Sequence, residues 1–271
     1  MSKLYKLGVI GNPIEHSMSP FIHSRFARYE NISLEYLPYK VNEPDFNKFV
    51  KEFFLDKIAK GLNVTLPYKK KAAEINGDIS KEAKYINAVN TITNYKNKLF
   101  LASTDGIGFI DDINSKKFDL ENKKILIIGA GAASESVLYK VAKSKVNAIT
   151  ILNRTKENSE KLQRKYSSIV PISLDVNSDC EFDLIINGSS AGLTGKFNSI
   201  DNLKFNSDAF FYDLNYSLTL TPFCKWAMTQ SSNVHDGMGM LVYQAAHSFK
   251  IWFDLFPDTK KVIKDIEGMK G

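Results

Sequence analysis

Short apolar runs alternate with segments of helical periodicity along almost the whole chain. In its first part, the apolar runs that predict strands cover residues 7–10, 34–39 and 61–64. Between them, Ser19-Pro20 is typical of a helix start, with Ser19 as the N-cap and Pro20 in the first turn, and Pro44 begins a second predicted helix. Residues 89–104 then alternate as a pair of strands.

A second series of strand and helix signals follows. The predicted strands cover residues 124–128, 148–152, 182–186 and 209–213, and the predicted helices cover residues 133–143, 156–166 and 239–256. Such alternation is typical of strand-helix units on a mainly parallel sheet, so the sequence predicts an α/β fold. In the last helix, Ala245, Phe249 and Trp252 repeat at helical spacing, and we expect this face to pack against the first part of the chain. The prediction is therefore two lobes, joined near Thr104 and Val234.

Composition and charge narrow the possible functions. The chain has 271 residues, enough for one large domain or two smaller ones. Its net charge of +6 comes mostly from scattered lysines, and the tightest cluster, Lys69-Lys70-Lys71, lacks the interleaved aromatic and arginine residues of a nucleic-acid surface. Cys180 and Cys224 show no redox or metal-ligand spacing, and neither a signal peptide nor an apolar run of membrane-spanning length is indicated. We expect a cytoplasmic enzyme of anionic small molecules, with no metal and no nucleic-acid or membrane partner.

The sequence GAGAAS at residues 129–134 follows a predicted strand and opens a predicted helix, which is the context that a dinucleotide-binding turn requires. One glycine permits the tight turn, the next lets the backbone approach a pyrophosphate, and free N–H groups at the helix start form an anion site. The residues assigned to this site are Gly129, Ala130, Gly131, Ala132 and Ala133. Ser134 stands where the usual pattern has its third glycine, which predicts a slightly larger separation of helix and strand. The alternative is a plain tight turn without a ligand.

The end of the next predicted strand favours NADP over NAD. An NAD site usually has an Asp or Glu here, which accepts a hydrogen bond from the ribose 2′-hydroxyl, whereas this strand runs into Asn153-Arg154-Thr155. Arg154 can form paired hydrogen bonds to a 2′-phosphate, and Thr155 and Lys156 can add donors. The alternative is a solvated arginine at a helix N-terminus.

A lysine at a helix start is a candidate for proton transfer. Asn63 and Thr65 lie two residues apart on a predicted strand, so both point to one face, and Lys69 enters the first turn of the following helix after Pro67. An ammonium group near the positive end of a helix dipole is disfavoured by roughly 0.3–1 kcal/mol. Such a group can give or take a proton near neutral pH when something holds it in place. The alternative is that Lys69–Lys71 is a solvated charge run.

Asp105 is a second residue that could take part in chemistry. It lies in STDGIG, residues 103–108, between the end of a predicted strand and an apparent helix, and the carboxyl ends of strands are common positions for ligand sites. By itself Asp105 is also a suitable helix N-cap. Asn90 offers an amide at the start of another strand, and by itself it is an ordinary turn residue.

Nine separate motifs make the chain similar to the shikimate dehydrogenase family over nearly its whole length. In order, they are GNPIEHSMSP (11–20), NVTLPYK (63–69), NAVNT (87–91), STDGIG (103–108), GAGAAS (129–134), NRT (153–155), NGSSAGL (187–193), DLNY (213–216) and DGMGMLVYQAA (236–246). The resemblance implies reduction of 3-dehydroshikimate to shikimate with NADPH, in the pathway through chorismate to the aromatic amino acids.

The resemblance also implies how the chain is divided. An α/β substrate-binding catalytic domain with a mainly parallel sheet would comprise residues 1–104 plus about 237–271, with the C-terminal helices returning to it. A Rossmann-like NADP-binding domain would comprise residues 105–236. We expect a monomer or a homodimer.

Roles for individual residues follow from the same resemblance. Lys69 and Asp105 would form the acid–base pair beside the reacting oxygen. Residues implied to hold the substrate are Ser17, Ser19, Thr65 and Tyr216 at its carboxylate and Asn63, Asn90 and Gln244 at its ring hydroxyls. Residues implied to line the nicotinamide side are Ser189, Leu214 and Gly237. Gln244 lies on a mostly apolar helix face, where its amide would otherwise be unpaired, so a ligand partner is expected.

The chain departs from the family pattern at three positions. Ala132 replaces a common glycine, Ser103 replaces an asparagine, and Asn158 replaces a second arginine, so weaker NADP selectivity is expected. His16 and His23 are assigned no catalytic or metal-binding role, because no carboxylate or cysteine spacing near them indicates a metal.

Two alternatives remain. One is a quinate or quinate/shikimate dehydrogenase that uses NAD, which is disfavoured by serine at both Ser17 and Ser19 and by the missing carboxylate after the second strand of the nucleotide-binding domain. The other is a nucleotide-binding regulatory protein without catalysis, which the presence of Lys69 and Asp105 disfavours.

Overall fold

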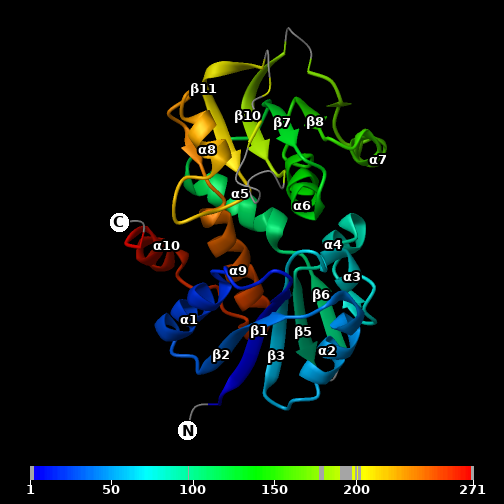
Figure 1. Cartoon of the computed structure of the whole chain (residues 1–271), viewed down its shortest axis with the longest axis vertical. Coiled ribbons are helices and arrows are strands. Elements are labelled where there is room, and N and C mark those ends of the chain that lie inside the picture. The colour runs from blue at the N-terminus through cyan, green and yellow to red at the C-terminus, as the bar shows by residue number, and fades with distance from the viewer. Residues whose placement is uncertain are drawn as a thin grey trace. The chain divides into compact units, whose positions relative to one another are not determined.

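The computed structural model describes residues 3–96, 98–176, 180–189, 197–198, 200 and 203–269. The chain forms two compact units, one from residues up to Gly108 together with Leu241–Met269 and the other from Phe109–Met240. Each unit has its own six-stranded sheet (Figure 1). Helices α5 (Asp105–Ser115) and α9 (Met238–Phe253) contain the chain positions at which one unit ends and the other begins. The predicted α/β class with mainly parallel sheets is confirmed.

The sheet of the first unit has the strand order β2-β1-β3-β5-β6-β4. Its strands are β1 (Tyr5–Gly11), β2 (Leu34–Lys40), β3 (Ala59–Val64), β4 (Asp78–Ile79), β5 (Thr91–Tyr95) and β6 (Lys98–Ala102). The first three run parallel, and β5 is antiparallel to both β3 and β6. In the β3–β5 pair Asn63 lies opposite Thr91, so the end of one strand and the start of the other become neighbours.

Helices cover both faces of this sheet (Figure 1). One face carries α2 (Phe46–Phe53), α3 (Lys69–Ala72) and α4 (Lys81–Ile86), and the other carries α1 (Ser19–Tyr29) and α9. Alternation along β1 explains the arrangement, because Ile10 packs with Phe46 of α2 whereas Val9 points to the opposite face and packs with Trp252 of α9. Helix α10 (Thr259–Glu267) contacts α1.

The sheet of the second unit is parallel throughout, with the order β12-β11-β10-β7-β8-β9. Its strands are β7 (Lys124–Ile128), β8 (Ala148–Leu152), β9 (Ile172–Ser173), β10 (Glu181–Asn187), β11 (Lys204–Asp213) and β12 (Val234–His235). The helices between them are α6 (Ala132–Val141), α7 (Lys156–Tyr166) and α8 (Pro222–Ala227). Counted from β7, this is the doubly wound order of dinucleotide-binding domains. Phe223 of α8 packs on one face with Phe211, and Phe109 of α5 meets Tyr212 edge-on, with ring centroids 5.0 Å apart.

Several predicted boundaries are wrong. The N-cap of α1 is Met18, and Ser19 is already helical. Pro44 lies in a short 3-10 turn (Glu43–Asp45) that precedes α2. The last long helix ends at Phe253 because Asp254 adopts φ 55°, outside the helical region.

Some short elements were not predicted. These are α4, α8, α10 and the two-residue strands β4, β9 and β12. Two-residue strands carry no hydrophobic period that a sequence can show. For α10 the sequence contains a helix-start signal, because aspartate is a favoured N-cap residue. In the structure Asp258 caps the helix by accepting a hydrogen bond from the N–H of Lys261 at 3.2 Å.

An aromatic cluster surrounds His23 in the core of the first unit. His23 is fully buried and stacks on Tyr36 with ring centroids 4.4 Å apart, next to Phe249 and Trp252. Within the described residues neither ring nitrogen has a hydrogen-bond partner. Burial lowers the pKa of His23 from 6.5 to about 3, and the neighbouring Asn63 offsets part of this effect.

We expect the protein to lose stability as the pH falls from 7 to 5. His23 remains neutral in the folded chain but takes up a proton in the unfolded chain, so the unfolded state binds more protons in this window. The expected decrease in the free energy of unfolding is about 2 kcal/mol. Denaturant titrations at both pH values would measure it in the wild type and in His23→Phe, with the exposed His16→Asn as the control. An equal pH dependence in the wild type and His23→Phe would contradict the assignment.

Candidate active site

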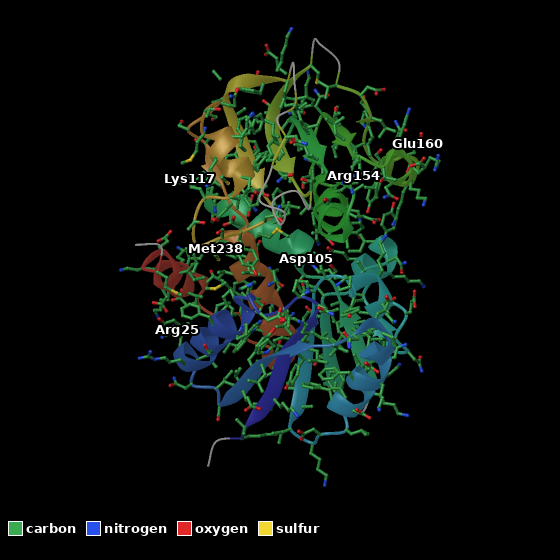
Figure 2. All side chains as sticks on the ribbon, viewed as in Figure 1. Arg25, Asp105, Lys117, Arg154, Glu160 and Met238 are labelled. Atoms are coloured by element: carbon green, nitrogen blue, oxygen red, sulfur yellow. The ribbon has the colours of Figure 1, made fainter. Side chains whose placement is uncertain are left out.

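The candidate acid–base pair forms within the first unit. Lys69 is the first residue of α3, after β3. Asp105, labelled in Figure 2, is the first residue of α5, after β6. Nζ of Lys69 lies 2.6 Å from Oδ2 of Asp105, and the two side chains are only 13% and 7% exposed. Low exposure limits screening by water, so this ion pair is held more firmly than a surface pair. The fold thus brings together the two residues that the sequence analysis paired.

Asn90 connects this pair to the neighbouring strands. Its Nδ2 donates to Oδ1 of Asp105 at 2.9 Å, and its Oδ1 accepts from the backbone N–H of Thr104 at 2.9 Å. Because a backbone N–H can only donate, the second bond determines which end of the Asn90 amide faces Asp105. One oxygen of the Asp105 carboxylate is therefore held by Lys69 and the other by Asn90.

Gln244 has protein partners, so the expectation that its amide would be unpaired without a ligand is wrong. Its Nε2 donates to the backbone oxygen of Leu241 at 2.8 Å, and its Oε1 accepts from Nδ2 of Asn90 at 3.2 Å. Helices α5 and α9 approach closely here, since a Cβ on Gly108 would lie 2.6 Å from the backbone nitrogen of Gln244. Within the described residues, the second N–H of the Gln244 amide remains available to a ligand.

Asn63 is a buried residue of β3 whose amide is largely used within the protein. Its Oδ1 accepts from the hydroxyl of Tyr36 at 2.7 Å. Its Nδ2 donates to the backbone oxygen of Asn90 at 3.0 Å and to Oγ of Ser248 at 3.0 Å. Since an amide nitrogen has two N–H bonds, Asn63 can offer a ligand only the remaining lone pair of Oδ1.

The two predicted serines lie together at the start of α1. Oγ of Ser17 accepts from the backbone N–H of Ser19 at 3.3 Å, and Ser19 is buried. Thr65 is half-buried and directly follows β3. Tyr216 is also half-buried and belongs to the second unit.

The predicted nucleotide-binding turn lies at the end of β7 in the second unit. Gly129 has φ +104°, in the left-handed region that favours glycine, whereas a Cβ on Gly131 would meet no atom within 4 Å. Gly131 is the N-cap of α6, and the first helical residues, Ala132 and Ala133, have N–H groups that no helical carbonyl accepts. Open space and free donors at one helix N-terminus fit a pyrophosphate.

Ser134 takes the place of the usual third glycine because the facing residue is itself a glycine. Ser134 is buried, and its Oγ donates to the backbone oxygen of Gly188 at 3.3 Å. A Cβ on Gly188 would overlap this Oγ. The loss of glycine on the helix is thus matched by a glycine after β10. The wider helix–strand separation stays a prediction.

The loop after β8 meets the glycine turn. Oδ1 of Asn153 accepts from the backbone N–H of Ala130 at 3.1 Å. Arg154 is exposed (Figure 2), and within the described residues its guanidinium has no ion pair. Thr155 is the N-cap of α7 and Lys156 its first residue. Among the described residues, Arg154 is thus a cation without a carboxylate partner, and its neighbour Asn153 bonds to the glycine turn. This arrangement fits the 2′-phosphate of NADP.

The three residues predicted for the nicotinamide side are neighbours. The N–H of Leu214 donates to the backbone oxygen of Asn187 at 2.7 Å, and Oγ of Ser189 donates to Oδ1 of Asn187 at 2.7 Å. The N–H of Gly237 donates to the backbone oxygen of Asn215 at 2.9 Å, and a Cβ on Gly237 would lie 2.5 Å from the backbone oxygen of Leu214. Residues 190–193 of the same motif lie outside the described residues.

Asp213 supports this group and was not predicted. It is fully buried and accepts hydrogen bonds from the side chains of Asn187, Asn215 and Thr221 at 2.9, 2.9 and 2.6 Å. Burial raises the pKa of its carboxyl, and these hydrogen bonds oppose the rise.

In the first unit, the sequence analysis missed Tyr36, Thr104 and Ser248. For two of them, the position in the sequence could have indicated a place in the site. Thr104 directly precedes Asp105, and Ser248 follows Gln244 at the i+4 spacing that places two side chains on one helix face.

Other features of the structure lie away from these residues. A groove of about 570 Å³ on the first unit is lined by residues of α2, residues 74–76, Asn94 and Leu99, and it contains no predicted site residue. Within the described ranges, no three His, Cys, Asp or Glu side chains are grouped so that they could hold a metal ion. In the same part of the chain, no helix has the length and apolar character needed to cross a bilayer.

Two features define the class of this protein. The second unit has the strand order and the open glycine turn of a dinucleotide-binding domain, and the first is a separate α/β unit with a buried lysine–aspartate pair. This combination defines two-domain oxidoreductases that use a nicotinamide nucleotide. Comparison with known proteins narrows the class. Residues 9–92 match the family model of the shikimate dehydrogenase substrate binding domain, residues 112–193 that of shikimate / quinate 5-dehydrogenase, and residues 237–266 that of the shikimate 5′-dehydrogenase C-terminal domain. The chain belongs to the shikimate dehydrogenase family.

Individual relatives support this assignment over the full length. A protein of Legionella pneumophila (strain Corby) named shikimate dehydrogenase (NADP(+)) is 38% identical, with 97% of this chain and 98% of the relative covered. A shikimate dehydrogenase solved in complex with NADP+ is 30% identical, with a TM-score of 0.88 and coverage of 100% of this chain and 98% of that one. A shikimate 5-dehydrogenase of Listeria monocytogenes, solved with shikimate and NAD, is 26% identical, with a TM-score of 0.86 and coverage of 98% and 97%.

Proposed function

We propose that this chain is an NADP-dependent shikimate dehydrogenase that reduces 3-dehydroshikimate to shikimate. The observation that carries the proposal is the buried Lys69–Asp105 pair, with Nζ and Oδ2 2.6 Å apart. When bound, the nicotinamide supplies or accepts the hydride. The chain must then move one proton to or from the same carbon's oxygen.

Lys69 has the capacity for this proton transfer. An ammonium group carries three N–H bonds, and one of them is used for Asp105 within the described residues. In the direction of reduction, a second N–H of Lys69 donates its proton to the carbonyl oxygen of the substrate as charge develops there. Asp105 keeps the ammonium group in place, because its other oxygen is fixed by Asn90.

The other predicted site residues are assigned to the carboxylate and the ring hydroxyls of the substrate. Ser17, Ser19, Thr65 and Tyr216 are proposed to bind the carboxylate through their hydroxyls. For the ring hydroxyls, Gln244 has one N–H available and Asn63 one lone pair. Asn90 already uses its amide within the protein, so its binding to a ring hydroxyl would require it to exchange one of these bonds.

We assign substrate binding and NADP binding to different units. The first unit contains the pair and matches the substrate-binding family model, so we assign substrate binding to residues 1–104 and about 237–271. The second unit contains the glycine turn and the loop of Arg154, so we assign NADP binding to residues 105–236. The same proposal includes a cytoplasmic location, a monomer or homodimer, and the absence of a nucleic-acid partner. The scattered distribution of the lysines supports the last of these.

Turnover tests the proposal directly. Absorbance of the reduced nicotinamide should rise when shikimate and NADP are added to the purified protein. Quinate with NAD, tested in parallel, distinguishes the quinate-type alternative. This comparison is needed because the Listeria relative was solved with NAD. Binding of NADP without any absorbance change would favour a regulatory protein and overturn the proposal.

We expect Arg154→Ala to abolish most of the preference for NADP. Loss of charge-assisted hydrogen bonds to the 2′-phosphate should lower kcat/KM with NADP roughly 10- to 100-fold, with little change for NAD. Initial rates with both nucleotides measure the ratio. Arg164→Ala is the matched control, because Arg164 lies on α7 and pairs with Glu160 at 3.8 Å. An unchanged ratio in Arg154→Ala would remove Arg154 from the site.

A further inference from the structure

Ser248 joins four segments of the first unit at one buried hydroxyl. It lies on α9, one turn after Gln244, and is fully buried. Its Oγ lies 3.0 Å from Nδ2 of Asn63, 2.7 Å from Oγ1 of Thr91 and 3.2 Å from Oγ1 of Thr104. It also lies 3.1 Å from the backbone oxygen of Gln244, to which it can donate. One oxygen thus connects β3, β5, the residue before α5, and α9.

The donors and acceptors around Ser248 show what it contributes. A hydroxyl has one donor and two acceptor positions, and Nδ2 of Asn63 can only donate, so Asn63 occupies one acceptor position of Ser248. The hydroxyl of Thr91 lies 2.8 Å from Oδ1 of Asn90. Ser248 and Thr91 therefore complete a hydrogen-bonded path from the amide of Asn63 to the amide of Asn90, which holds Asp105.

Asn63 has no equally good acceptor besides Ser248 for its second N–H. In the described residues, the next acceptor is Oγ1 of Thr91 at 3.3 Å. A buried donor that loses its acceptor is unfavourable, so without the hydroxyl of Ser248 the amide of Asn63 is expected to rotate or shift. Its Oδ1, the atom left for a ring hydroxyl, would move with it.

We infer that Ser248 is a positioning residue for the substrate ring. It holds the Asn63 amide directly and the Asn90 amide through Thr91, and so sets where the ring hydroxyls bind. The inference rests on the proposed function, because shikimate is the ring that these amides would recognise.

Ser248→Ala tests the inference. We expect the KM for shikimate to rise about five- to tenfold, which is the effect of losing one or two hydrogen bonds, and the KM for NADP to change less than about twofold. Ser248→Thr, which restores a hydroxyl, should recover most of the affinity. Ser144→Ala is the matched control, since Ser144 also bonds back to a helix carbonyl, that of Lys140 at 2.9 Å, and belongs to the second unit. Melting temperatures of all variants measure stability separately.

A double-mutant cycle keeps the test valid if Ser248→Thr does not fold. Thr91→Val removes the next hydroxyl of the path with little change in shape, and Thr91→Val with Ser248→Ala should raise the KM for shikimate by less than the product of the two single effects. A lower melting temperature with both KM values unchanged, or an equal rise in both, would overturn the inference and leave Ser248 a structural residue. A wild-type protein without shikimate turnover would instead overturn the proposed function, and this inference with it.

Discussion

Replacement of Lys69 by alanine is expected to lower kcat roughly 10²- to 10⁴-fold, which is the range that a positioned proton donor contributes. The KM for shikimate should change far less, because the contacts proposed between the substrate and the serine, threonine and glutamine side chains do not involve Lys69. Steady-state rates with shikimate and NADP separate the two effects. The large effect is expected because Lys69 is the group with spare N–H bonds next to Asp105.

Lys70→Ala is the matched control for this variant. Lys70 is the next residue of α3 and is exposed, so its loss removes the same charge from the same helix without touching the pair. Near-normal turnover in Lys69→Ala would contradict the proton-transfer role. A comparable loss in Lys70→Ala would show that the net charge of α3, and not the geometry of Lys69, is responsible.

Asp105→Asn is expected to lower kcat roughly 10²- to 10³-fold although it changes the shape of the side chain little. Asp105 accepts from Lys69 at one oxygen and from Asn90 at the other. An asparagine must present its NH₂ group to one of these two donors, so one contact becomes repulsive and Lys69 loses its fixed position. Comparison of kcat and of the fraction of protein that binds NADP shows whether the loss is catalytic.

The double variant Lys69→Ala with Asp105→Asn supplies the check on this assignment. If the two side chains act as one unit, the double variant should be about as slow as the slower single variant. Multiplied effects would mean that Asp105 acts independently of Lys69, which would contradict the holding role assigned to it.

Much of the fold could be predicted because the signals are local. The strand at residues 148–152 and the helix at residues 156–166 are observed with the predicted bounds. The strand is a mostly apolar run, AITIL, and the helix carries its buried residues Ser159, Leu162 and Tyr166 at helical spacing. Some boundaries failed, as at Ser19, which is the first helical residue and not the cap; its backbone N–H donates to Oγ of Ser17 at 3.3 Å.

The candidate site was predicted by motif, but its internal connections were not. Lys69 and Asp105 are 36 residues apart and were paired by resemblance, whereas the 2.6 Å contact follows from β3 and β6 belonging to one sheet. Gln244 was expected to need a ligand because its helix face is apolar. In the structure, Asn90 reaches it from the loop just before β5, a contact that no property of the helix itself reveals.

Strand and helix periods, the glycine turn and the residue types at each motif can be read without coordinates, because they depend on neighbours a few positions away. Which donors and acceptors are already used inside the protein is decided only by the tertiary structure. The amides of Asn63, Asn90 and Gln244 and the hydroxyl of Ser248 come from one strand, one loop and one helix, and hydrogen bonds depend on distances that only the assembled unit defines.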